Sequence, residues 1–176
     1  MESHKQYPET LLRALKFATD AHKGQTRKGS GEAYMAHPLA VLEKADQVFS
    51  KIKFLPQNGY YGHGADKNAM WDSMIIPQVA LLHDIMKDTA YEFNDIEDKF
   101  GLEVAQHCWT LVHSQGECYT NYLKRIHNTG EIIPIVIKIA DMQHNLETGE
   151  GVLSKWKLEL YRTWIWIFSR KIGYEG

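Results

Sequence analysis

The residues best suited to chemistry in this sequence are an adjacent histidine and aspartate, His83 and Asp84, at the end of an apolar segment. Neighbouring residues of a helix point about 100° apart, so both side chains can contact one ion only if it lies between their directions. An imidazole nitrogen beside a carboxylate oxygen suits Mn, Fe or Zn better than a metal that prefers thiolates. Because such a pair also occurs at ordinary helix ends, its interpretation depends on further candidate ligands.

Two further candidates lie far away in the sequence. Asp141 lies within an otherwise apolar segment, where an unpaired carboxylate would be costly to bury. A bound cation would compensate this charge, and so would a salt bridge to Lys138, so this residue alone leaves both readings open. His37 stands at the start of an expected helix. His144 follows Asp141 on the same helical face, where we expect it to line the cleft without binding an ion.

A short basic loop, GQTRKGSG at 24–31, is the third candidate feature. Arg27 and Lys28 lie among three glycines there, which gives two cations and a flexible backbone for binding phosphates. The loop is not a Walker A motif, because Ser30 and Gly31 stand where that motif requires Lys and Ser or Thr. A solvated basic turn is the alternative reading.

The elements that must position these groups are expected to be helices almost throughout. The run from Ile132 to Ile139 is rich in β-branched residues and could form a strand, but nothing else in the sequence reads as a strand to pair with it. We therefore predict a buried helix there and an all-α fold in a single domain over 1–176. Apolar spacing, prolines and glycines predict helices over 8–23, 38–48, 102–113 and 152–170, and a weak helix over 119–128. Two more helices are expected to begin at Pro77 and Pro134, and a short one is expected to end at Phe100.

Composition excludes several classes of protein. The chain has 176 residues, 44% of them hydrophobic and 24% charged, with a net charge of −2, which argues against disorder and against a strongly electrostatic nucleic-acid binder. No apolar run is long enough to span a bilayer, and the N-terminus does not resemble a secretory signal. Two cysteines, Cys108 and Cys118, form no disulfide framework. We therefore expect a cytoplasmic protein without a nucleic-acid or membrane partner.

The chain resembles a known family in both its candidate ligands and their surroundings. The set His37, His83, Asp84 and Asp141 resembles the HD superfamily of metal-dependent phosphohydrolases. Four blocks resemble the Rel/SpoT hydrolase domain and the small stand-alone alarmone hydrolases, and they run in family order from about residue 10 to 150. The blocks are AHKGQTRKGSGEAYMAHPLAV at 21–41, ALLHDIMKDT at 80–89, IEDKFGLEVA at 96–105 and KIADMQHNLET at 138–148.

This resemblance implies an HD-type helical bundle that holds one divalent metal ion, usually Mn²⁺, on those four residues. The family reaction removes the 3′-pyrophosphate from the alarmone (p)ppGpp of the stringent response. Bound metal would supply a hydroxide for attack on phosphorus. The expected partner is therefore a small phosphorylated nucleotide. Positions that match nucleotide-binding residues of the family are Arg27, Lys28, Tyr34, Asn145 and Thr148.

One position departs from the family motif His-Asp-x-x-Glu-Asp, because Lys87 replaces its glutamate. Lysine cannot accept a proton at neutral pH unless its pKa is strongly lowered. Asp88 could act as the base instead, or Lys87 could bind a substrate phosphate and shift specificity. The third reading is a nucleotide-binding regulatory domain without activity. We favour retained hydrolysis, with an HD phosphatase for another nucleotide as a further alternative.

Two segments fall outside these motifs. The stretch 53–74 is rich in glycine, asparagine and aromatic residues, and it makes the spacing between the two histidine ligands longer than in compact relatives. It could be a lid that presents Tyr60, Tyr61 and His63, or a surface excursion without a role. The aromatic helix expected over 152–170 has an apolar stripe suited to packing on the core or on a second copy in a homo-oligomer.

Overall fold

The computed structural model describes residues 8–52, 74–149 and 151–176, and the regular elements in these ranges are all helices. The predicted all-α fold is confirmed. Isolated bridges join Thr26 to Ala33 and Ile52 to Tyr174. The helices are α1 (Glu9–Ala21), α2 (Ala36–Ser50), α4 (Ile75–Leu82), α5 (Ile85–Asp88), α6 (Phe93–Phe100), α7 (Leu102–Thr110), α8 (Tyr119–Thr129), α9 (Ile132–Thr148) and α10 (Lys155–Ile172).

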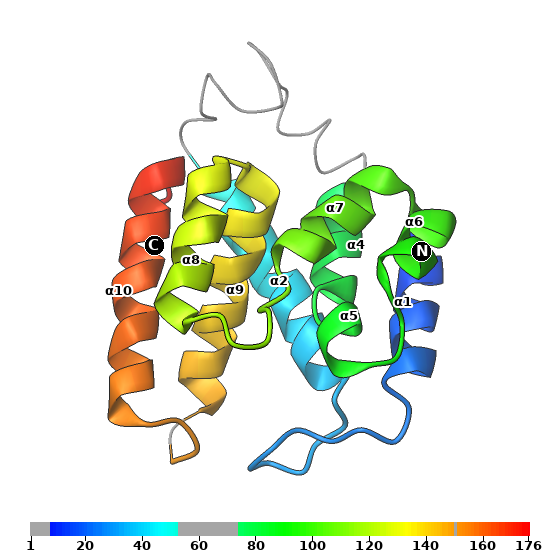
Figure 1. Ribbon diagram of the computed structural model, residues 1–176, viewed down its shortest axis with the longest axis horizontal. Helices are drawn as coiled ribbons and strands as arrows, with labels where there is room; N and C mark the ends of the chain where they lie inside the picture. Colours follow the sequence, from blue (N-terminus) through cyan, green and yellow to red (C-terminus); the bar gives the residue numbers. More distant parts are fainter. Residues whose placement is uncertain (1–7, 53–73, 150) are drawn as a thin grey trace, which may run out of the picture.

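Helix α9 is the central element of the bundle. It packs against α2, α4, α7, α8 and α10, and α2 in turn packs on α4. In Figure 1, α8, α9 and α10 lie on the left, α1 and α4 to α7 lie on the right, and α2 crosses between the two groups. The bundle therefore brings α2, the end of α4 and α9 together, and these elements carry the four candidate ligands.

Helix α9 is buried along most of its length. Every residue from Ile132 to Met142 is buried, including the β-branched run that could have formed a strand. A helix satisfies its own backbone hydrogen bonds, whereas a lone buried strand would leave them unpaired. No strand lies in the described ranges to pair with this run, and the prediction of a buried helix is confirmed.

Several helix boundaries differ from those predicted. Pro8 caps α1 instead of forming its first residue, and α4 begins at Ile75, two residues before the proline expected to open it. The most consequential difference is a break after Leu82. His83 caps the end of α4 and Asp84 precedes α5, so these neighbours do not lie within one continuous helix.

Helix α10 only partly matches the predicted apolar stripe. Trp164 and Phe168 are buried, as such a stripe requires, but Trp156 is 62% exposed. Ser154 caps this helix by accepting a hydrogen bond from the backbone N–H of Lys157, which fixes its first turn two to three residues later than predicted.

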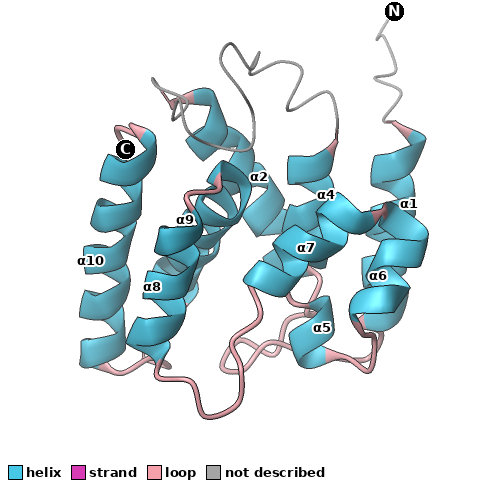
Figure 2. Cartoon of the chain, turned by 45° about the horizontal axis from the view of Figure 1, so that its top comes forward, coloured by secondary structure: helices cyan, strands magenta, loops and turns pink. Residues whose placement is uncertain are grey.

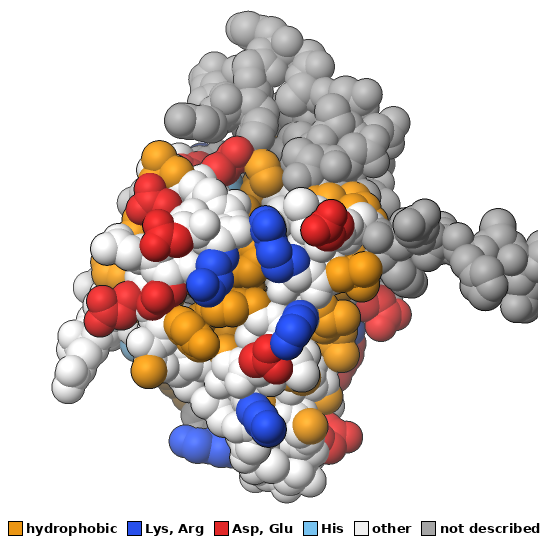
Figure 3. Space-filling model, turned by 90° about the vertical axis from the view of Figure 1, so that its right-hand side faces the viewer, with side chains coloured by type: hydrophobic (Ala, Val, Ile, Leu, Met, Phe, Trp, Pro, Cys, Tyr) orange, Lys and Arg blue, Asp and Glu red, His pale blue; other side chains and the backbone are white. Residues whose placement is uncertain are grey.

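The connecting loops and the outer surface give two further observations. The loops that follow α1 and α7 lie at the same end of the bundle as α5 (Figure 2). On the face that carries α1 and α6, acidic and basic side chains are interspersed with hydrophobic ones (Figure 3).

Among the described helices, none has the length and apolar character needed to cross a membrane.

Candidate active site

The break between α4 and α5 places His83 and Asp84 at the centre of the site. His83 is buried, and its Nδ1 lies 2.7 Å from the carbonyl oxygen of Ala80. A carbonyl only accepts hydrogen bonds, so Nδ1 carries a hydrogen, and in the neutral ring Nε2 presents a lone pair. That Nε2 is buried without a hydrogen-bond partner among the described residues, 3.3 Å from Oδ2 of Asp84. Two electron-rich atoms facing each other suit a cation between them.

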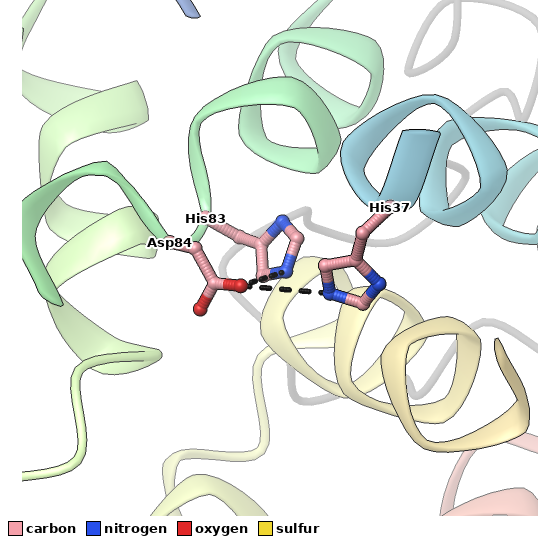
Figure 4. A group of neighbouring side chains, drawn as sticks. All are labelled: His37, His83 and Asp84. Carbon is pink, nitrogen blue, oxygen red and sulfur yellow. Dashed lines mark ion pairs between the residues drawn. The ribbon is translucent and has the colours of Figure 1, made fainter. Parts of the chain in front are cut away.

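His37 completes the cluster from the first turn of α2. Its Nε2 lies 3.5 Å from Oδ2 of Asp84 and 3.3 Å from Oδ1 of Asp141. Figure 4 shows the rings of His37 and His83 directed toward the same carboxylate oxygen. Ligand atoms of His37, His83 and Asp84 all lie within 4.8 Å of one another. The structure thus brings together three of the four candidate ligands, and Asp141 adjoins this group through His37.

Asp141 forms the salt bridge that its sequence context offered as one of two alternatives. Lys138 forms an ion pair with Oδ2 at 2.6 Å, whereas Oδ1 faces His37 and accepts a hydrogen bond of 2.5 Å from Asn145. The salt bridge therefore occupies one carboxylate oxygen and leaves the other directed into the cluster. The alternative reading of Asp141 as a salt-bridge residue is correct without excluding the site.

Both aspartates remain ionised because of their neighbours. Burial alone would raise the pKa of Asp84, but without a bound cation His83 and His37 in their protonated forms, together with Lys87, hold it well below the usual range. Burial likewise opposes ionisation of Asp141, and Lys138 with His37 reverses that effect and lowers the pKa of this carboxyl. A buried and a half-buried carboxylate beside two buried imidazoles are a hard-to-borderline donor set, which is suited to Mn²⁺ or a similar ion.

Lys87 and Asp88 lie beside the cluster, at the outer edge. The Nζ of Lys87 is 3.1 Å from Oδ1 of Asp84 and 2.9 Å from Oδ2 of Asp88. Partial burial would lower the pKa of this lysine, but the two carboxylates raise it above the ordinary value. Lys87 therefore keeps its proton at neutral pH and is unsuited to act as a base.

Tyr34 has a position that the sequence did not predict. Its hydroxyl lies 2.8 Å from Oδ2 of Asp84 and 2.5 Å from Oδ2 of Asp88, so it donates to a carboxylate of the cluster. The ring stacks on His22 at 4.3 Å between centroids. Tyr34 was expected to bind nucleotide; its hydroxyl contacts the carboxylates, and the residue also lines both cavities at this site. No local motif signals this contact, because its partners are about 50 residues away.

The basic loop reaches the same cluster through Asn145. Arg27 donates a hydrogen bond of 2.9 Å to Oδ1 of Asn145, whose Nδ2 binds Asp141. Gly29 adopts a φ of 95°, and a Cβ at this position would lie 2.5 Å from Cγ2 of Val152. The loop between α1 and α2 is therefore in close contact with the loop between α9 and α10.

Two adjoining cavities open at this loop. The first has a volume of about 540 Å³ and is lined by the four candidate ligands together with Arg27, Lys28, Lys87 and Asn145. The second, of about 590 Å³, shares Arg27, Lys28 and Lys87 and reaches Asp88 and Thr148. Both volumes are in the range of small-molecule sites. Thr148 lies apart from the cluster, and its hydroxyl donates to the backbone oxygen of His144.

One wall of the first cavity consists of residues that the sequence did not predict to lie at the site. Lys157 lies 3.4 Å from the centroid of the Tyr119 ring, and Tyr161 and His113 line the same wall. These residues come from α8, α10 and the loop before α8, so no spacing within one segment could reveal that they meet. Tyr60, Tyr61 and His63, proposed as parts of a lid, lie outside the described residues.

Comparison with known proteins supports the resemblance to the Rel/SpoT hydrolases. No protein-family model matches the chain. It is 30% identical over 153 residues to the bifunctional (p)ppGpp synthase/hydrolase SpoT of Escherichia coli K12, covering 78% of this chain and 18% of that protein. It is 28% identical to the guanosine-3′,5′-bis(diphosphate) 3′-pyrophosphohydrolase of Aquifex aeolicus, covering 84% of this chain and 19% of that protein.

The fold has a counterpart among solved structures. A metazoan orthologue of SpoT that hydrolyses ppGpp superposes with a TM-score of 0.67 at 19% identity, covering 95% of this chain and 88% of that one. The chain spans about a fifth of the length of the curated relatives that it matches. Most of this chain is therefore similar to one segment of much longer (p)ppGpp synthase and hydrolase proteins. It also shares the helical fold of the solved relative.

Proposed function

We propose that this protein is a metal-dependent phosphohydrolase that removes the 3′-pyrophosphate of (p)ppGpp or a related phosphorylated nucleotide. The observation that carries this proposal is the cluster of ligand atoms from His37, His83 and Asp84, which lie within 4.8 Å of one another, with Oδ1 of Asp141 3.3 Å from His37. The buried lone pair of His83 faces a carboxylate oxygen there. The named activities of the relatives give the substrate class.

The donor set fits one divalent ion, and Mn²⁺ is the ion that we propose. Two imidazole nitrogens and two carboxylate oxygens would hold it, and Asp141 would contribute the oxygen that Lys138 leaves available. A bound ion of this kind makes water more acidic and polarises a phosphoryl oxygen. The residues of the chain must then orient the water, accept its proton and hold the nucleotide.

Asp88 is the residue that we assign as the base. It lies next to the ligand Asp84, with Oδ2 held by Tyr34 and Lys87. In the reaction, a water oxygen bonds to the phosphorus attached to the ribose 3′ oxygen, and Asp88 takes the water proton. The bond between that phosphorus and the 3′ oxygen breaks, the 3′ oxygen gains a proton, and pyrophosphate leaves.

Lys87, Arg27 and Lys28 supply positive charge around the same cavities. The phosphates of a substrate carry negative charge that increases on the leaving group, and fixed cations stabilise it. We assign Lys87 to the reacting pyrophosphate and the loop cations to the remaining phosphates. Asn145 and Thr148 border the nucleotide side, while Tyr34 acts chiefly through its hydrogen bonds to the carboxylates.

A regulatory nucleotide-binding domain is the second candidate function. Lys87 places a positive charge on both Asp84 and Asp88, which would weaken cation binding and leave the base partly neutralised. Such a domain would bind the nucleotide without releasing a product. An HD phosphatase with another nucleotide substrate is the third candidate, and it differs only in what the cavities accept.

The deciding experiment is turnover of ppGpp with added Mn²⁺, with guanosine diphosphate and pyrophosphate separated by chromatography. We expect Asp84→Ala to remove activity, because it deletes a ligand, and Asp98→Ala to retain it, because that carboxylate is exposed on α6. Equal turnover by wild type and Asp84→Ala would contradict the assignment. Saturable binding without product would favour the regulatory function, and a panel of other nucleotides tests the third candidate.

We also infer a cytoplasmic location. Cys108 is buried and Cys118 exposed, and both are free thiols, which suits a reducing compartment. A small phosphorylated nucleotide is the partner that we propose, and the volumes of the two cavities are consistent with a ligand of that size.

A further inference from the structure

His144 contacts the ring of the candidate ligand His37 at the nitrogen that faces away from the carboxylates. It lies on α9, three residues after Asp141, and its Nδ1 is 2.8 Å from Nδ1 of His37. The two ring centroids are 4.9 Å apart. The opposite nitrogen of His37, Nε2, faces the carboxylates of Asp84 and Asp141. His37 is thus held between the cluster on one side and His144 on the other.

The distance between the two Nδ1 atoms requires that one of them carry a hydrogen. A neutral imidazole has one nitrogen that donates and one that accepts. If Nε2 of His37 presents a lone pair to a cation, its hydrogen must be on Nδ1, and Nδ1 of His144 must then accept it. If Nε2 of His37 instead donates to Asp141, the roles of the two Nδ1 atoms are reversed.

His83 provides an internal comparison for this arrangement. Its Nδ1 donates to the backbone oxygen of Ala80, an acceptor that cannot change its role. His37 lacks a backbone oxygen at the corresponding atom and has the imidazole of His144 there instead. Groups behind a metal-binding imidazole fix its tautomer and ring orientation, and their removal commonly weakens metal binding about 10- to 100-fold.

We propose that His144 is a positioning residue that accepts the Nδ1 hydrogen of His37 and so directs the Nε2 lone pair of His37 toward the bound cation. This inference rests on the metal centre proposed above. His144 does not itself contact the cation. Its side chain does for His37 what the Ala80 carbonyl does for His83, and it does so from the helix that also supplies Asp141.

The test is titration of the purified full chain with Mn²⁺ by calorimetry. We expect His144→Phe to weaken binding about 10- to 100-fold, because phenylalanine keeps a ring but has no acceptor. His144→Asn can place its side-chain oxygen near the position of Nδ1, and we expect it to restore most of the affinity. Gln143→Leu is the matched control, since this neighbouring side chain binds Tyr174 and points about 100° away from His144 around α9.

The outcomes separate the two levels of the proposal. Failure of the wild type to bind Mn²⁺ would contradict the metal centre itself. Binding by the wild type with unchanged affinity in His144→Phe would contradict only the role of His144. Thermal unfolding of each variant without metal shows whether a loss of affinity reflects a loss of fold.

A measurement on the wild type alone covers the case in which His144→Phe does not fold. Nitrogen-15 chemical shifts of imidazole distinguish protonated from unprotonated ring nitrogens, and diamagnetic Zn²⁺ allows them to be recorded with the site loaded. We expect a protonated Nδ1 on His37 and an unprotonated Nδ1 on His144. The opposite pattern would overturn the assignment.

Discussion

Asp84 and Asp141 each have a lysine three residues away, and the two ion pairs differ in how far they are buried. The difference shows how burial changes the contribution of an ion pair whose sequence spacing is the same. Lys138 and Asp141 are buried in α9, with side chains 9% and 10% exposed and a separation of 2.6 Å. Lys87 is 45% exposed, and it divides its ammonium between Asp84 at 3.1 Å and Asp88 at 2.9 Å. The sequence spacing determines which charged groups can form an ion pair, and burial determines how much that ion pair contributes to stability.

The buried pair is a fixed part of the fold, whereas the exposed pair is adjustable. Lys138 cannot leave Asp141 without stranding two charges in the core, so that carboxylate always keeps one oxygen compensated. Lys87 can move into solvent at small cost. We therefore expect changes at Lys138 to affect stability and changes at Lys87 to affect chemistry.

The largest effect is expected from Lys138→Met, which breaks the buried pair. Asp141 then loses the cation that compensates its buried charge, and we expect a loss of about 3–5 kcal/mol in the free energy of unfolding. Urea denaturation in the presence of EDTA measures it. The double variant Lys138→Met/Asp141→Leu removes both charges and should recover most of the loss. A single variant as stable as the wild type would show that burial does not distinguish the pairs.

The next effect concerns cation affinity at the exposed pair. Lys87→Glu replaces a positive charge by a negative one beside Asp84, and we expect Mn²⁺ to bind about tenfold more tightly or better. Lys87→Gln should fall between glutamate and lysine. Calorimetric titration of the three proteins gives this order directly, and an affinity independent of residue 87 would contradict it.

Turnover by the same Lys87→Glu variant indicates what the lysine does in the reaction. A gain in the rate of ppGpp hydrolysis would mean that Lys87 attenuates the native enzyme. A loss would mean that its positive charge supports the reacting phosphates, which is the outcome that we expect. Lys99→Glu on the exposed face of α6 is a control for the general effect of charge reversal.

A smaller effect is expected from acid. The pKa of Asp141 is lower in the folded protein than in the unfolded chain, so its ionised form stabilises the fold above the unfolded value of about 3.9. This stabilisation is lost as the pH falls from about 4 toward the lower folded value, by at most about 1.4 kcal/mol per pH unit. Urea denaturation without metal should show a shallower loss in Asp141→Asn than in wild type. Parallel profiles would contradict this.

The smallest effect is expected on the stability of the exposed pair. Lys87→Gln should change the free energy of unfolding by less than about 1 kcal/mol, because solvent screens a half-exposed ion pair. The same urea series that measures Lys138→Met provides the comparison. A cost for Lys87→Gln as large as that for Lys138→Met would remove the distinction between the two pairs.

Much of this molecule could be predicted from the order of its residues. Apolar periodicity predicted the helical fold, and the lack of a partner strand was enough to interpret the Ile132–Ile139 run correctly as a helix. The ligand candidates His37, His83, Asp84 and Asp141 came from residue chemistry and family spacing, and the structure clusters the first three with Asp141 next to His37. These features depend on local patterns or on motifs with a fixed order.

Other features could not be read from sequence, because they depend on contacts between distant elements. The break after Leu82 has no proline or glycine to signal it, yet it determines how His83 and Asp84 face one another. The contact of Tyr34 with the carboxylates and the wall containing Lys157 both join separate helices. The exposure of Trp156 depends on where the first turn of α10 is capped.

The contact between Gly29 and Val152 has a consequence for which molecules can enter. Val152 borders the second cavity, and the space beside Gly29 is too small for even a methyl group. The two loops therefore meet beside the second cavity, and their separation there depends on the size of two side chains far apart in the sequence. We expect alanine at position 29 to force the two loops apart, and a residue smaller than valine at position 152 to relax their contact. Access to the second cavity would thus change without a substitution at any of the four candidate ligands or at Lys87.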